Sequence, residues 1–173
     1  MRHRKLIALA VPLLVVIAFG ASALANDQNS SFGARLSGYD EVPAINSAGT
    51  GQFAATVNSS GTMITYKLSY SGLSSTALAA HIHFAQRAVA GGVVAFLCGG
   101  GGKPACPPSG GTVSGTIVAS DIQALPAQGI AAGDLVGVLR AMRAGVTYVN
   151  VHSTNFPGGE IRGQIGGQEE DED

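Results

Sequence analysis

The sequence predicts an all-β domain, a Greek-key sandwich or barrel with one short amphipathic helix. Two observations lead to this prediction. Apolar residues recur at every second position through several short segments, and clusters of glycine, proline and serine separate these segments. A fold of alternating strands and helices would need repeated helical periodicity, and only one segment of this chain has it.

The clearest pair of strands is expected at residues 53–57 and 64–70. Apolar residues occupy alternate positions in both segments, and the turn-forming sequence N-S-S-G separates them, which is typical of a β-hairpin. Further strands are expected at residues 78–85, 93–98, 112–118, 146–152 and 160–165.

Helical spacing occurs once, in residues 134–144. Apolar residues take positions i, i+3, i+4 and i+7 of this segment: Leu135, Val138, Leu139 and Met142. Asp134 precedes them as a candidate N-cap, and Gly145 follows them. One short helix should therefore pack against the strands.

The start of the chain has the organisation of a cleavable secretion signal (residues 1–25). A basic start (1–5) precedes an apolar run (6–21), and Ala23 and Ala25 offer the small residues that signal peptidase reads. The alternative is an uncleaved anchor, but a membrane span needs about 20 apolar residues. We expect cleavage after Ala25 and a mature chain free of the membrane, either secreted or in the periplasm or cell envelope.

The mature chain expected after cleavage has few charged residues. A polar leader (26–31) should precede one domain (32–166), and five of the acidic residues fall in an expected disordered tail (167–173). The rest is nearly neutral, and its basic residues are scattered. Nucleic acid and anionic lipid both require clustered basic residues, so we expect neither as partner. An extracellular or envelope partner of unknown identity is expected.

Cys98 and Cys106 are the only two cysteines. In an exported protein an even number of cysteines indicates a disulfide bond, here one that closes a short loop rich in glycine and proline. The alternative is a pair of zinc thiolates, but seven intervening residues are not a compact zinc spacing. We expect the disulfide.

Three histidines form the candidate metal site: His81, His83 and His152. Residues i and i+2 of a strand share a face, about 6.5 to 7 Å apart, so His81 and His83 could bind one ion at about 2.0 to 2.1 Å each. His152 ends a strand of its own, on the less apolar face. The alternative is three hydrogen-bonded histidines without a metal.

Imidazole suits both copper and zinc, so either is the expected ion. The candidates for orienting the ligands are Asn150, Glu160, Arg162 and Gln164. Only neutral imidazole binds metal, and affinity should therefore fall below the ordinary histidine pKa of about 6.5.

No catalytic residues can be assigned. No serine lies in a G-x-S-x-G elbow. Asp40 and Glu41 are adjacent on an apparent turn, where solvated carboxylates are expected rather than a glycosidase pair. These observations favour a non-enzymatic binding or structural role.

Longer motifs resemble a known family. They are L-S-G-Y-D-E-V-P (36–43), A-H-I-H-F (80–84), and Y-V-N-V-H-S-T (148–154) leading into F-P-G-G-E-I-R-G-Q (156–164). The chain is similar to the CHRD domain, a module named for chordin and also found singly in bacterial exported proteins. It departs from the usual pattern at Ala85-Gln86-Arg87, where a glycine is expected. The resemblance implies an extracellular β module without a settled biochemical activity.

A fainter likeness concerns the copper-zinc superoxide dismutases, through the H-x-H strand, the later V-x-V-H and the closing G-G-x-x-R-x-G. It implies that His81, His83 and His152 match copper-ligand positions and that Arg162 lies near the copper. That family's bridging histidine and zinc ligands have no counterpart here. An exported binding module is the leading hypothesis, a copper-dependent redox enzyme is the alternative, and an envelope-matrix protein is the third option.

Overall fold

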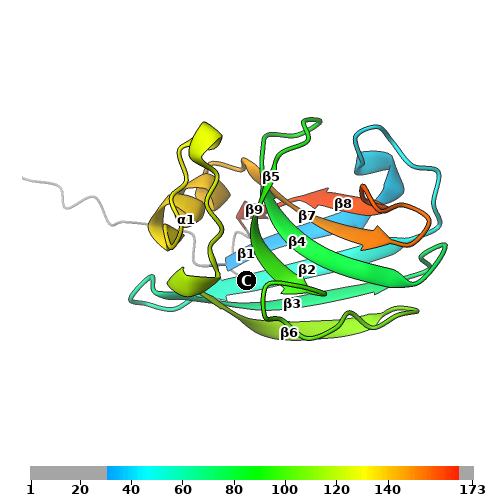
Figure 1. Cartoon of the computed structure of the whole chain (residues 1–173), viewed down its shortest axis with the longest axis horizontal. Helices are drawn as coiled ribbons and strands as arrows, with labels where there is room; N and C mark the ends of the chain where they lie inside the picture. Colours follow the sequence, from blue (N-terminus) through cyan, green and yellow to red (C-terminus); the bar gives the residue numbers. More distant parts are fainter. Residues whose placement is uncertain (1–30, 168–173) are drawn as a thin grey trace, which may run out of the picture.

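The computed structural model describes residues 31–167 (Figure 1). The expected signal (1–25), nearly all of the leader and the acidic residues 169–173 lie outside the described residues. The strands are β1 (Ser31–Ser37), β2 (Thr50–Val57), β3 (Met63–Ser71), β4 (Ala77–Phe84), β5 (Gly92–Cys98), β6 (Gly111–Val118), β7 (Thr147–Ser153), β8 (Ile161–Gln164) and β9 (Gly166–Gly167). The one α-helix of the described residues is α1 (Leu135–Arg143).

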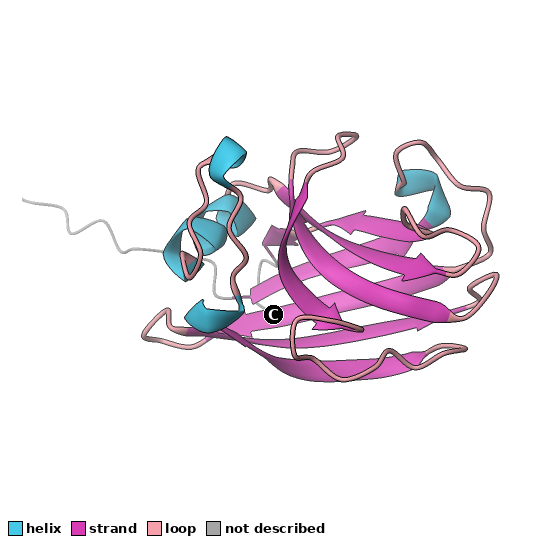
Figure 2. Cartoon of the chain, in the orientation of Figure 1, coloured by secondary structure: helices cyan, strands magenta, loops and turns pink. Residues whose placement is uncertain are grey.

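The prediction of an all-β fold is confirmed. The strands pair in the order β5-β4-β7-β8-β1-β2-β3-β6, with β9 beside β1, and every pairing is antiparallel. Figure 2 shows the sheet curling round on itself, with α1 at one end of it. No helix of the described residues is long and apolar enough to cross a membrane.

The alternation of the sequence explains the strands. In β3 the apolar residues at every second position are buried, and their neighbours Thr65 and Lys67 are exposed. The predicted hairpin joins β2 to β3. In its turn Asn58 Oδ1 accepts hydrogen bonds from the amides of Thr62 and Met63, and Gly61 takes a positive φ.

The helix and the disulfide also follow the sequence. Asp134 Oδ1 accepts a hydrogen bond of 2.8 Å from the Gly137 amide at the start of α1, which supports its role as N-cap. The four apolar positions of the helix are buried in the core. Cys98 and Cys106 form a disulfide that ties the end of β5 to the loop before β6.

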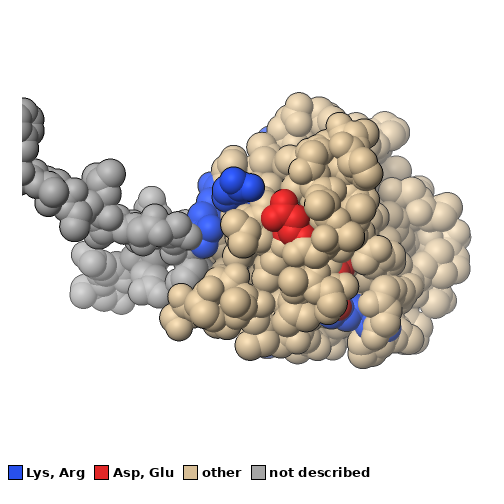
Figure 3. Space-filling model, turned by 60° about the vertical axis from the view of Figure 1, so that its left-hand side comes forward, with Lys and Arg blue, Asp and Glu red and all other residues tan. Residues whose placement is uncertain are grey.

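Charged side chains are few on the surface. Residues 31–167 include seven basic and five acidic residues, and most of the face in Figure 3 is uncharged. Two ion pairs form among the described residues, Arg87 with Asp40 and Lys103 with Asp121.

Candidate metal centre

The structure brings the three candidate histidines together, as a group that we call the histidine cluster (His81, His83 and His152). Along β4, Ala80 and Ile82 point into the hydrophobic core, so His81 and His83 share the opposite face of the strand. β7 pairs with β4, and Ala79 is the partner of His152. This pairing places His152 diagonally from His81 on neighbouring strands.

The distances within the histidine cluster are close to those of a metal site. One nitrogen from each ring lies within 4.8 Å of the others, and His81 Nδ1 is 3.0 Å from His152 Nε2. Two nitrogens that bind one ion at 2.0 to 2.1 Å with tetrahedral geometry are about 3.3 Å apart. The nitrogens that are up to 4.8 Å apart would have to approach by up to about 1.5 Å to share one ion.

Main-chain carbonyls orient two of the imidazoles. His83 Nδ1 is 3.0 Å from the Gly91 carbonyl oxygen, and His152 Nδ1 is 2.9 Å from that of Pro157. A carbonyl oxygen only accepts hydrogen bonds, so each Nδ1 carries the proton and each Nε2 keeps its lone pair. This second contact is what holds the rings of metal-binding histidines in known sites.

Two buried imidazole nitrogens lack a partner among the described residues. They are Nε2 of His81 and Nε2 of His83, on side chains that are 9% and 8% exposed. Buried polar atoms are nearly always hydrogen-bonded, and an unpaired one requires an explanation. The unused lone pair of His83 fits a ligand position in a metal site.

Burial also keeps the imidazoles neutral. Loss of solvent, together with the neighbouring histidines, lowers the pKa of His81 to about 3. Burial lowers the pKa of His83 to about 4, against a smaller opposite effect of its hydrogen bond to Gly91. Burial likewise lowers the pKa of His152. All three rings are therefore neutral at pH 7, the state in which imidazole binds metal.

Aromatic rings and an arginine pack against the histidine cluster. The Tyr148 ring stacks on His83, with centroids 4.7 Å apart and planes 7° apart, and Phe96 meets His81 edge-on. The Arg162 guanidinium lies 3.4 Å from the centroid of the Tyr148 ring. Arg162 thus reaches the histidine cluster through Tyr148, and it also donates to the carbonyl of Gln86.

A half-buried carboxyl lies beside this stack. Glu41 accepts a hydrogen bond from Asn150 Nδ2, and burial raises its pKa to about 7 despite the opposing charge of Arg162. Gly159 makes this contact possible, because a Cβ there would lie 2.7 Å from Glu41 Oε1. The expected solvated turn therefore describes Asp40, whose side chain is 42% exposed, but not Glu41.

The other candidates for orienting the ligands have separate partners. Glu160 is fully buried and accepts hydrogen bonds from Ser47, Ser74 and Ser153. Burial alone would raise its pKa, but these bonds lower it further than burial raises it. Gln164 donates to the carbonyls of Ala85 and Gly145.

Sequence reasoning missed the carbonyls that orient the rings, the packing of Phe96 and Tyr148, and the burial of Glu41. Any residue type provides a carbonyl, so the sequence contains no signal for Gly91 or Pro157. Glu41 does lie in the family motif L-S-G-Y-D-E-V-P (36–43), and this motif was the available signal for its role.

Comparison with known proteins gives one match. The model of the CHRD domain family matches residues 32–165, which is most of the chain. Neither the curated proteins nor the solved structures contain a match. On the strength of the family match, the chain belongs to the CHRD domain family.

Proposed function

We propose that this CHRD domain is an exported module that binds one copper or zinc ion through the histidine cluster. The observation that carries the proposal is the set of three neutral imidazoles, whose ring nitrogens lie within 4.8 Å of one another. Hydrogen bonds to main-chain carbonyls keep the proton on Nδ1 of His83 and of His152, so the Nε2 atom of each ring has its lone pair. In His81, Nδ1 donates a hydrogen bond of 3.0 Å to the lone pair of His152 Nε2, so binding of one ion by both rings requires the His81 proton to move from Nδ1 to Nε2.

Export is supported by three features. An oxidising compartment is favoured by the signal-like residues 1–25 and by the disulfide between Cys98 and Cys106. It is also favoured by membership of a family of extracellular modules. Copper and zinc exchange more freely in such a compartment than in a thiol-rich cytoplasm.

The proposed site has an open position. The histidine cluster contains no cysteine or carboxylate among the described residues, so the ion would keep its full charge. Structural zinc sites are normally closed by four protein ligands, whereas three ligands leave room for water or an anion. The site would therefore accept an exogenous ligand.

Metal titration tests the proposal. Protein freed of metal with a chelator should bind one equivalent of Zn²⁺ or Cu²⁺ in calorimetry, and elemental analysis after gel filtration should find the same ratio. The Cu²⁺ form should show imidazole nitrogen couplings in its electron paramagnetic resonance spectrum. A chain that retains neither metal through gel filtration would contradict the proposal.

A copper-dependent redox enzyme is the second candidate, and the open position favours it. Its test is superoxide turnover by the copper-loaded protein after gel filtration has removed free copper, measured against a His83→Gln variant that was treated with copper and filtered in the same way. Turnover by the unchanged protein that does not exceed that of the variant would contradict the enzymatic role and leave the binding role.

The lowered pKa values predict how binding depends on pH. At pH 5.5, three imidazoles with the ordinary pKa of 6.5 would release about 2.7 protons when zinc binds. With the pKa of His81 at about 3 and that of His83 at about 4, we expect release of less than about one proton. The loss of affinity should therefore begin below pH 6.5, where His152 is protonated, and become steep only near pH 4, where His83 is protonated as well.

Calorimetry at pH 5.5 in two buffers of different ionisation enthalpy counts these protons. Circular dichroism at the same pH checks that the protein is folded. Release of two or more protons would mean that the rings are solvated and that this description of the site is wrong.

A further inference from the structure

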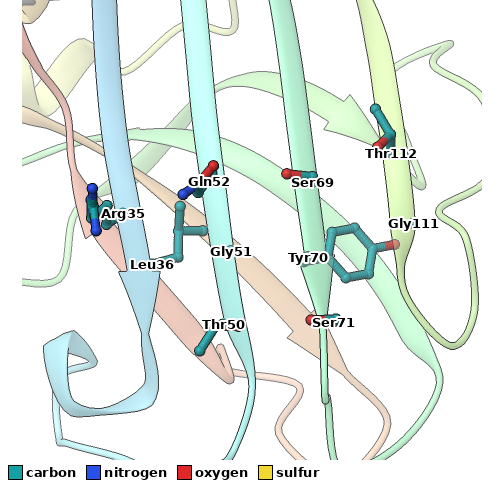
Figure 4. A pocket seen from close by; sticks show the side chains of 10 residues that line it. All are labelled: Arg35, Leu36, Thr50, Gly51, Gln52, Ser69, Tyr70, Ser71, Gly111 and Thr112. Carbon is teal, nitrogen blue, oxygen red and sulfur yellow. The ribbon is translucent and has the colours of Figure 1, made fainter.

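A second polar region lies away from the histidine cluster, on the outer face of β1, β2, β3 and β6. Two adjoining hollows of about 600 and 610 Å³ share Arg35, Gln52 and Ser69 in their lining. Figure 4 shows one of them, with its side chains spread across the four strands. We call this region the polar face, defined by the residues that line the two hollows.

Strand register arranges the polar face in rows. Arg35 pairs with Gln52, Gln52 with Ser69, and Ser69 with Thr112, so one row of polar side chains crosses all four strands. Figure 4 shows these four side chains in line. At a strand spacing of about 4.8 Å the row is about 14 Å long. It offers a guanidinium, an amide and two hydroxyls to one extended ligand.

The charged side chains of the polar face are all positive. Arg35 and Lys67 are the charged residues that line the two hollows, and no Asp or Glu lines either one. Both are exposed, and neither takes part in the two ion pairs of the described residues. The register places them two strands apart and two residues apart along the strand, roughly 12 Å.

These features restrict the ligand. Neutral sugars are commonly bound on aromatic rings, but the aromatic residues that line the two hollows, Tyr70 and Phe53, are both buried, and the Tyr70 hydroxyl donates to the Pro107 carbonyl. Nucleic acid and heavily sulfated polymers require dense clusters of basic residues. Two separated cations among hydroxyl and amide groups fit a polymer that carries no more than one carboxylate on each sugar and keeps its hydroxyl groups.

We propose that the polar face binds a carboxylate-bearing polysaccharide, one that contains uronate residues. Arg35 and Lys67 pair with its carboxylates, and Gln52, Ser69 and Thr112 form hydrogen bonds with its hydroxyl groups. The site is independent of the histidine cluster, so the module would hold a metal on one face and an acidic glycan on another.

Affinity electrophoresis and calorimetry with polygalacturonate test this proposal, with dextran as the neutral polymer and dextran sulfate as the sulfated one. The protein should bind polygalacturonate and not dextran. Arg35→Gln and Lys67→Gln should each weaken binding about tenfold. Arg140→Gln is the matched control, because Arg140 is an exposed arginine of α1 outside both hollows. It should change binding less than twofold.

Several outcomes would overturn the proposal. One is an equal loss in Arg140→Gln, which would indicate non-specific attraction, and another is tighter binding of dextran sulfate than of polygalacturonate. A third is binding of polygalacturonate only by a variant in which the acidic residues 169–173 are replaced by uncharged ones, which would identify that segment as the occupant of the polar face. Arg35 and Lys67 are exposed, so both variants should fold as the unchanged protein does, and equal circular dichroism spectra and equal midpoints of thermal unfolding check this.

Discussion

His83→Gln should lower the affinity for Zn²⁺ at least about a hundredfold. Loss of a group that merely orients a metal ligand costs about 10- to 100-fold, so loss of the ligand itself should cost at least the upper value. Glutamine keeps a polar side chain of similar size beside Tyr148 but lacks the Nε2 lone pair that Gly91 orients in His83. Calorimetric titration of the metal-free variant measures the change.

Phe96→Leu is the matched control for this measurement. Phe96 packs edge-on against His81 at a centroid distance of 4.6 Å, but it has no atom that binds metal. Its replacement should disturb packing and leave zinc affinity within about tenfold. Equal affinity of His83→Gln and the unchanged protein would show that the ion binds elsewhere.

Glu160→Ala should lower the free energy of unfolding by about 3 to 5 kcal/mol. The carboxylate of Glu160 is fully buried and accepts hydrogen bonds from the hydroxyls of Ser47, Ser74 and Ser153 and from the Ser74 amide. Alanine would leave these donors without an acceptor in a buried cavity. Urea unfolding monitored by tyrosine fluorescence measures the loss.

Two further variants separate charge from position. Glu160→Gln keeps an acceptor oxygen and should lose less stability than alanine. Asp40→Ala removes an exposed carboxylate whose ion pair with Arg87 is open to solvent, so it should cost less than about 1 kcal/mol. A Glu160→Ala chain as stable as Asp40→Ala would mean that water replaces the carboxylate in its contacts.

The sequence predicts most of the fold because strand formation follows a local pattern. The expected strand at 78–85 differs from β4 by one residue at each end, and the expected strand at 112–118 differs from β6 by one residue at its start. The sequence does not delimit β1 or β9. β9 contains only Gly166 and Gly167, which have no side chains to form an alternating pattern.

The candidate site was predictable only in part. The same-face placement of His81 and His83 follows from their spacing, since it depends on one strand. The approach of His152 depends on the pairing of β7 with β4, which no local pattern specifies. The burial of Glu41 depends on the loop that contains Gly159, more than a hundred residues later in the chain.

The pairing of β8 with β1 has a consequence for cooperativity. β8 and β1 share one residue pair, Ser37 with Arg162, and β9, which follows β8, adds two more pairs with β1, whereas β2 and β3 share eight. We expect local opening of the sheet to begin at this short ladder, which separates the half β5-β4-β7-β8 from the half β1-β2-β3-β6. The histidine cluster belongs to the first half of the sheet, and the polar face belongs to the second half except for Gln164 of β8. A ligand that rigidifies one half would leave local opening of the other half largely unchanged, and the two surfaces would act as separate modules within one small domain.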